Sequence, residues 1–246
     1  MRVRSLWLQQ QQIISRKLLV NFHKFMLRKI TFGLLWLGFI SYAFFFAPPE
    51  QPDTFELIKN LSTGNWQGIN PLIICLFNIM GIWPFIYSAV VFCDGRGQKI
   101  PAWPFAIGAF ALGAFALLPY LALREPNQKF IGEKNSFLKI LDSRILGILL
   151  TLAATVLFTF SLQGDGSDFL HQWQNNRFIH VMSLDFIILS LLFPTLLGDD
   201  MMRRGWQNNQ LFWLFAMPLF GALIYLCVRP PIEIENKKGV ENTIFN

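Results

Sequence analysis

The sequence predicts an all-α protein, a polytopic transmembrane bundle of about six helices in two related three-helix halves. Of its 246 residues, 53% are hydrophobic and only 15% are charged, which leaves too little polar surface for a soluble globule of this size. The charged residues are clustered and leave six long apolar windows, whereas a bilayer requires about 20 mostly apolar residues per helix. These windows are residues 30–47, 71–93, 100–123, 145–162, 178–198 and 211–228.

The first, fourth and sixth windows are short for spanning helices. Each is about 18 residues long, close to the lower limit for crossing a bilayer, so the number of spans lies between five and seven. Cys75, Cys93 and Cys227 lie within or at the end of windows and form no CxxC pair, so we interpret them as packing residues.

Residues 1–29 precede the first window and predict a basic amphipathic helix on the membrane surface. Seven Lys and Arg residues alternate there with apolar side chains. Their position beside a window favours anionic lipid over nucleic acid as the reason for the net charge of +6. A secretory signal is disfavoured because glutamines at 9–12 interrupt the apolar stretch and no small-residue cleavage site follows.

The distribution of basic residues predicts a cytoplasmic N-terminus. With six spans, thirteen of the 21 Lys and Arg residues lie on the side of the N-terminus and eight on the other. Five of those eight fall in one loop, as Arg124, Lys129, Lys134, Lys139 and Arg144.

Two parts of the chain resemble each other. At a shift of 105 residues, Leu118, Tyr120, Leu121, Arg124 and Pro126 recur as Leu223, Tyr225, Leu226, Arg229 and Pro231, and Asp94 and Phe115 match Asp199 and Phe220. At a shift of 107, Trp66 and Gln67 match Trp173 and Gln174. The alternative is chance similarity between apolar segments.

The repeat divides the chain into a first three-helix half at 30–126, a polar linker at 127–143, a second half at 144–231 and a polar tail at 232–246. Because three is an odd number of crossings, two such halves would have opposite orientations in the bilayer, as in several transporter folds.

Asp185 is the one carboxylate within the six windows. At this depth a carboxylate costs on the order of 2 to 3 kcal/mol, so we place a candidate intramembrane polar site at Asp185, with Asn78, His180 and Ser183 as neighbours. Asn78 is its counterpart at the shift of 107. Asp185 would bind a proton, cation or substrate, or else form an interhelical hydrogen bond.

Charges between the windows form a second candidate set. Asp94 and Arg96 belong to a short glycine-rich loop that predicts a tight turn, and Asp199 and Asp200 begin the matching loop. The paired aspartates would hold a magnesium diphosphate or, as we favour, form salt bridges in a solvated loop. The three histidines have no second ligand at helical spacing, so we expect no metal and no cofactor.

Small residues and prolines mark breaks within the windows. The step from Ala109 to Gly113 favours close helix approach. Prolines at 84, 119, 194 and 218 are expected to kink their helices.

Three segments are distinctive beyond their hydrophobicity. They are residues 65–71 (Asn-Trp-Gln-Gly-Ile-Asn-Pro), 81–105 with Ser-Ala-Val-Val-Phe at 88–92, and 177–181 (Arg-Phe-Ile-His-Val) followed by Ser183 and Asp185. Over about residues 47–232 the chain resembles an uncharacterised multipass membrane protein family of cyanobacteria with plastid relatives. The resemblance implies a cyanobacterial thylakoid or plasma membrane, and no activity or catalytic residue.

These observations leave three functional hypotheses. The first is a non-enzymatic protein that assists the assembly, stability or organisation of a photosynthetic membrane complex. The second is a small inverted-repeat transporter or channel with its polar site at Asp185 and Asn78. The third is an intramembrane enzyme acting on an isoprenoid or pigment lipid. Membrane lipids and other membrane subunits are the expected partners, not nucleic acid.

Overall fold

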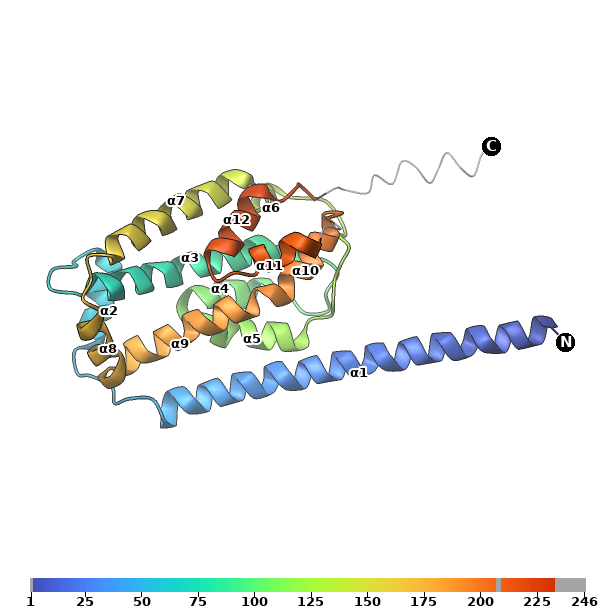
Figure 1. Cartoon of the computed structure of the whole chain (residues 1–246), viewed down its shortest axis with the longest axis horizontal. Helices are drawn as coiled ribbons and strands as arrows, with labels where there is room; N and C mark the ends of the chain where they lie inside the picture. The colour runs from blue at the N-terminus through green and yellow to red at the C-terminus, as the bar shows by residue number, and fades with distance from the viewer. Residues whose placement is uncertain (1, 207–208, 233–246) are drawn as a thin grey trace.

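The computed structural model describes residues 2–206 and 209–232, and these residues form helices joined by loops (Figure 1). The all-α prediction is confirmed. The helices are α1 (Arg2–Phe45), α2 (Thr54–Thr63), α3 (Pro71–Asp94), α4 (Trp103–Leu112), α5 (Ala114–Leu123), α6 (Ser136–Leu141), α7 (Arg144–Ser161), α8 (Gly166–Asn175), α9 (Arg177–Leu192), α10 (Pro194–Arg203), η1 (Asn209–Leu211), α11 (Phe212–Phe215) and α12 (Phe220–Val228).

Four helical segments of the described chain are long and apolar enough to cross a membrane. They are Phe25–Phe45 within α1, Pro71–Asp94, Arg144–Ser161 and Arg177–Arg203, which combines α9 and α10. Helices α9 and α10 meet at Pro194, which has no backbone N–H to continue the helical hydrogen bonds. Four such segments indicate an integral membrane protein, and they correspond to the first, second, fourth and fifth windows.

The third window contains no helix long enough to span a membrane. It folds into α4 and α5, two short helices that pack against each other and turn at Gly113, which has a φ of 52°. The hairpin enters and leaves at the same end of the bundle, since the Asn127 side chain donates to the carbonyls of Asp94 and Arg96, both at 2.7 Å. This window is therefore a re-entrant hairpin.

The sixth window also turns back. After η1 and α11, the chain reverses around Pro218 and Leu219, where φ is 54°, and returns as α12. Arg204, at the end of α10, donates to the Pro230 carbonyl beyond α12 at 2.7 Å, so this segment too begins and ends on one side. The six windows thus contain four candidate spans and two helical hairpins.

This topology corrects two further expectations. Each half contains two of the four candidate spans, so the odd number of spans from which we expected opposite orientations of residues 30–126 and 144–231 is absent. We expected the basic loop at 124–144 on the side opposite the N-terminus. It lies instead at the end of the bundle where α3, α10 and α12 end, and the N-terminal part of α1 projects from this same end (Figure 1).

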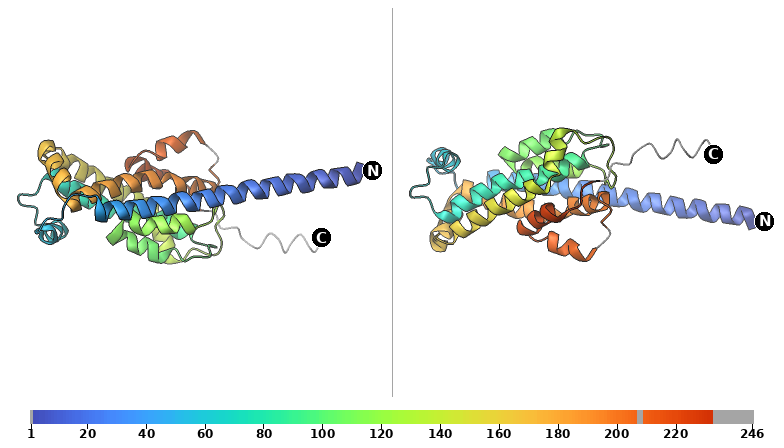
Figure 2. Two further views of the ribbon diagram at one scale, coloured as in Figure 1. Left: turned by 90° about the horizontal axis from the view of Figure 1, so that it is seen from below. Right: turned by 90° about the horizontal axis from the view of Figure 1, so that it is seen from above.

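The N-terminal segment continues directly into the first span. The 44 residues of α1 form one helix of about 66 Å, roughly twice the thickness of the hydrocarbon core of a bilayer. No break separates residues 2–29 from the first window, in contrast to the separate surface helix we expected. Figure 2 shows α1 running between the α4–α5 hairpin and the α9–α10 helices. Of the predicted polar tail, residues 233–246 lie outside the described residues.

The centre of the bundle is α3, which packs against α4, α7, α9 and α10. Its Trp83 and Tyr87 are fully buried, and the Tyr87 hydroxyl donates to the Leu189 carbonyl of α9 at 2.5 Å. Asn70 and Asn176 cap α3 and α9 by accepting hydrogen bonds from the amides of Leu72 and Ile179. These caps fix where the two central spans begin.

Candidate functional site

Asp185 holds the tip of the first hairpin. Its Oδ1 accepts a hydrogen bond from the amide of Ala114, the first residue of α5, at 2.8 Å, and the residue is only 7% exposed. A carboxylate is favourable there because the N-terminus of a helix carries partial positive charge. A Cβ atom at Gly113 would overlap the Asp185 carboxylate, so the turn requires glycine for this contact as well as for its positive φ.

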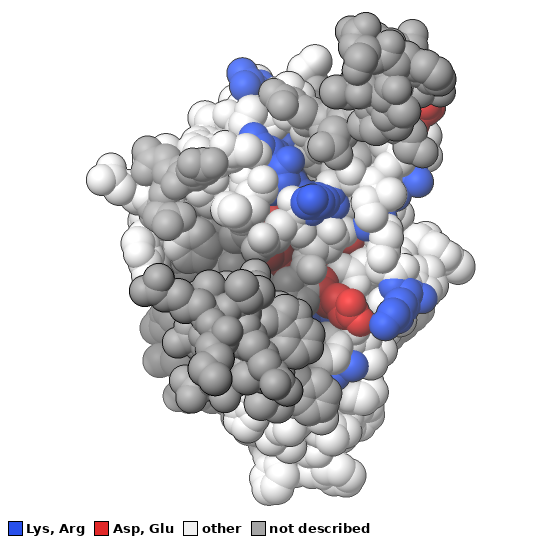
Figure 3. Space-filling view, turned by 90° about the vertical axis from the view of Figure 1, so that its right-hand side faces the viewer, with Lys and Arg blue, Asp and Glu red and all other residues white. Residues whose placement is uncertain are grey.

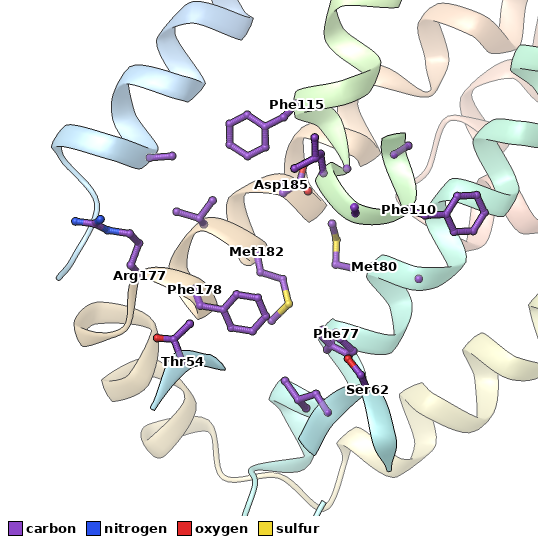
Figure 4. Close-up of a pocket in the computed structure, with 18 of the residues that line it drawn as sticks. Thr54, Ser62, Phe77, Met80, Phe110, Phe115, Arg177, Phe178, Met182 and Asp185 are labelled. Atoms are coloured by element: carbon purple, nitrogen blue, oxygen red, sulfur yellow. The ribbon is translucent and has the colours of Figure 1, made fainter. Parts of the chain in front are cut away.

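A groove of about 960 Å³ begins beside Asp185. Its walls come from α1, α2, α3, the hairpin tip and α9, and its middle is apolar and largely aromatic (Figure 4). The side chains that form this middle part include Phe77, Met80, Phe115, Phe178 and Met182, and Phe110 lines the groove at the hairpin tip. Asp185 and Asn78 contribute polar groups to the groove. Thr54 and Ser62, near the two ends of α2, and Arg177, at the start of α9, also line it.

Two of the four residues predicted for the polar site line this groove. Asp185 lines it from α9 and Asn78 from α3, where the Asn78 amide donates to the Ile74 carbonyl at 2.8 Å. Ser183 is not in the lining and donates to the Ile179 carbonyl of its own helix at 2.7 Å. The interhelical hydrogen bond considered for Asp185 is present, and its donor is a backbone amide.

His180 lies apart from the groove, between α1 and α8. Its Nε2 is 2.9 Å from the Tyr42 hydroxyl, its Nδ1 is 2.9 Å from the Trp173 carbonyl, and its ring stacks on Trp173 at 4.4 Å between centroids. The Arg177 Nε also donates to the Pro48 carbonyl at 2.9 Å. These contacts attach the end of α1 to the start of α9, so His180 positions a wall of the groove.

A second polar cluster lies buried at the end of the bundle where the hairpins enter. Asp94, which is 0% exposed, accepts hydrogen bonds from the Tyr120 hydroxyl at 2.6 Å and from Arg124 at 2.6 and 2.7 Å. Arg203 of α10 donates to the same carboxylate at 3.0 Å. One aspartate therefore joins the end of α3 to the end of its hairpin and to α10.

Asp200 has the same kind of surroundings in the second half. It accepts from the Tyr225 hydroxyl at 2.7 Å and from Arg204 at 2.8 Å, and Arg229 lies 3.7 Å away. Tyr120 and Arg124 recur as Tyr225 and Arg229 in the sequence comparison, which paired Asp94 with Asp199. The matching acid in space is Asp200, whereas Asp199 bonds to Arg124 at 2.5 Å and links the halves.

Three of the four predicted loop charges are therefore helical, and two of them, Asp94 and Asp200, are buried rather than solvated. Asp94 ends α3 and the two aspartates belong to α10. Figure 3 looks onto this end of the molecule and shows Lys and Arg side chains around a smaller group of acids. Arg96 contributes only its carbonyl, as an acceptor for Asn127 at 2.7 Å.

Asp142 completes the cluster, and sequence reasoning missed it. It is 2.6 Å from both the Lys134 ammonium and the Arg204 guanidinium. Burial alone would raise the pKa of Asp142, but the charges of Arg204, Lys134 and Arg229 outweigh it and hold that pKa below its ordinary value. Hydropathy could not find this residue, because a charge between two windows is expected to be solvated.

Among residues 2–206 and 209–232, no group of three His, Cys, Asp or Glu side chains could hold a metal ion. Comparison of the chain with protein-family models, curated proteins and solved structures finds no match.

Proposed function

We propose that this integral membrane protein binds an amphiphilic, lipid-like molecule in the groove beside Asp185. The observation that carries the proposal is the groove itself, whose volume suits a small molecule of several hundred daltons. Its aromatic and methionine walls suit an apolar body. Its few polar groups lie toward the ends, where they would fix the orientation of a bound molecule.

The groove favours this function over the three hypotheses from the sequence. An assembly factor needs a partner surface and gives no reason for such a cavity. A channel needs a continuous path, but the tip of the hairpin closes the groove at Asp185, and the buried charges of Asp94 and Asp200 fill the bundle beyond it. An enzyme needs a second group for proton transfer close to the first, whereas the other carboxylate of the lining, Glu50, lies beside Arg177, away from Asp185.

We also propose that the basic end of the bundle faces the cytoplasm. Of the described Lys and Arg residues, Lys59 on α2 and Arg177 at the start of α9 lie at the opposite end, and the others lie at the end where the hairpins enter or on the projecting part of α1. Such a bias supports this orientation. The two halves are then related, parallel units, a reading supported by the matching of Tyr120 and Arg124 with Tyr225 and Arg229. A photosynthetic membrane rests on the family resemblance alone.

The test of the groove fills it without disturbing the bundle. Gly81 lines the groove, and a Cβ atom added there meets nothing within 4 Å, so Gly81→Phe introduces a ring at the wall of the cavity from an unstrained Cβ position. Gly38 on α1 is equally open but does not line the groove, which makes Gly38→Phe the matched control. Both changes replace a helical glycine and favour the helix.

Small molecules retained by each purified protein are identified by native mass spectrometry after gentle solubilisation. We expect the parent and Gly38→Phe to retain the same amphiphile, and Gly81→Phe to lose it while unfolding at an unchanged or higher temperature. An equal content of bound molecules in all three proteins would contradict the proposal.

A further inference from the structure

We propose that the molecule bound in the groove is a lipophilic cation, whose positive charge pairs with the Asp185 carboxylate. This inference rests on the proposed function and specifies the class of ligand.

The charge of Asp185 is only partly compensated by the protein. Its Oδ1 accepts from the Ala114 amide, but its Oδ2 has no hydrogen-bond partner among the described residues. No Lys or Arg of the described chain forms an ion pair with it. A carboxylate held within a bundle at membrane depth usually has a partner, so a cation in the groove would supply the missing one.

The walls of the groove suit a cation with an apolar body. Phe115 of the hairpin lies beside Asp185, and Phe77 and Phe178 line the groove farther along, on α3 and α9 (Figure 4). Trp36 of α1 also lines it. Aromatic faces attract a positive charge through their quadrupole, and most strongly where water is excluded. Aromatic walls that end at the Asp185 carboxylate are therefore complementary to an apolar ammonium or phosphonium ion.

The one basic side chain of the lining lies far from Asp185. Arg177 is eight residues earlier on α9, about 12 Å along the helix, and its Nε is bonded to the Pro48 carbonyl. An anionic headgroup at Arg177 would place its hydrocarbon chain against the Asp185 carboxylate. A cation is favoured because its charge and its apolar body each meet a complementary surface.

The ligand can enter from the bilayer. Phe44, Phe110 and Leu112 line the groove and are 68, 48 and 58% exposed on the membrane-facing surface. The helix α1 packs closely on α5 but makes few contacts with α9, which leaves the side of the groove open. An apolar cation dissolved in the membrane therefore reaches Asp185 without crossing the buried charges.

The experiment compares two ions of the same shape and opposite charge. Binding of tetraphenylphosphonium and tetraphenylborate to the purified protein in a nonionic detergent is measured by equilibrium dialysis. We expect the parent to bind the cation at least about tenfold more tightly than the anion, and Asp185→Asn to remove that preference. The carbonyl oxygen of the substituted side chain can still accept from the Ala114 amide, so the hairpin is kept. Glu56→Gln, an exposed carboxylate on α2 outside the groove, should retain the preference.

The remaining outcomes distinguish this inference from the proposed function. Equal binding of both ions to the parent, blocked by Gly81→Phe, would overturn the cation inference and leave the groove as a binding site. Binding of neither ion would also overturn the cation inference. The proposed function is then decided separately, by whether Gly81→Phe loses the small molecule that the parent and Gly38→Phe retain. If Asp185→Asn fails to fold, the ratio of the two ions on the parent decides the question alone.

Discussion

Asp94 and Asp200 are each surrounded by a tyrosine hydroxyl and by arginine guanidinium groups, with almost no exposure to solvent. A buried ion pair is weakly stabilising as a whole, because desolvation of both charges offsets their attraction. Removing one partner is costly, because the other is left buried and unpaired. The cluster therefore specifies which helix ends meet, and each aspartate in it is sensitive to substitution.

Asp94→Asn is expected to destabilise the protein by about 3 to 5 kcal/mol, because it removes the negative charge that Arg124 and Arg203 share and leaves both arginines buried without it. The free energy of unfolding in detergent measures the effect. Glu125→Gln is the control, since its pair with Lys99 is exposed and should contribute less than about 1 kcal/mol. A loss at Asp94 as small as that at Glu125 would contradict a buried network.

At this scale the sequence predicts where polar groups lie better than what they contact. Asp185 was identifiable because a carboxylate in an apolar window is costly. Its partner was not, since the amide of Ala114 is a backbone group and leaves no mark in the sequence. Asn78 lines the same groove as Asp185, whereas Asp142 between two windows gave no signal.

The two hairpins are the elements that shape both sites. Hydropathy located their windows but could not distinguish a span from a hairpin, because both require a long apolar stretch. The turns were visible only as Gly113 and Pro218, which we interpreted as a close helix contact and a kink. The buried charges at the hairpin bases supply the constraint that hydropathy lacks.

Gly113→Ala is expected to disrupt the first hairpin and lower the thermal stability of the protein, because the new Cβ overlaps the Asp185 carboxylate. Gly132 has a φ of 93° but open space around its Cβ, so Gly132→Ala carries only the backbone strain of about 1 to 2 kcal/mol. Thermal unfolding of the two variants separates the clash from the strain. Equal losses would show that the contact between Gly113 and Asp185 is unimportant.

In the whole molecule, α1 packs on α5 as α7 packs on α12, so each hairpin lies against the first span of its own half. The halves differ in one respect. In the second half, the first span α7 also packs closely on α3, the central span of the other half. In the first half, the groove separates the first span α1 from α9, the corresponding span of the other half. The site proposed for the ligand is thus the place where the two halves depart from each other, a feature that no pairwise sequence match could reveal.

Groove, hairpins and buried charges all depend on re-entrant topology, and labelling of single cysteines tests it most directly. Lys99→Cys and Lys129→Cys flank the first hairpin, Lys59→Cys lies on α2, and all three positions are exposed. Each is placed in a background without the three native cysteines and treated in sealed vesicles with a membrane-impermeant maleimide. We expect positions 99 and 129 to react from one side of the membrane and position 59 from the other. Reaction of position 129 from the side of position 59 would show that residues 100–123 cross the membrane, and would contradict the structure described above.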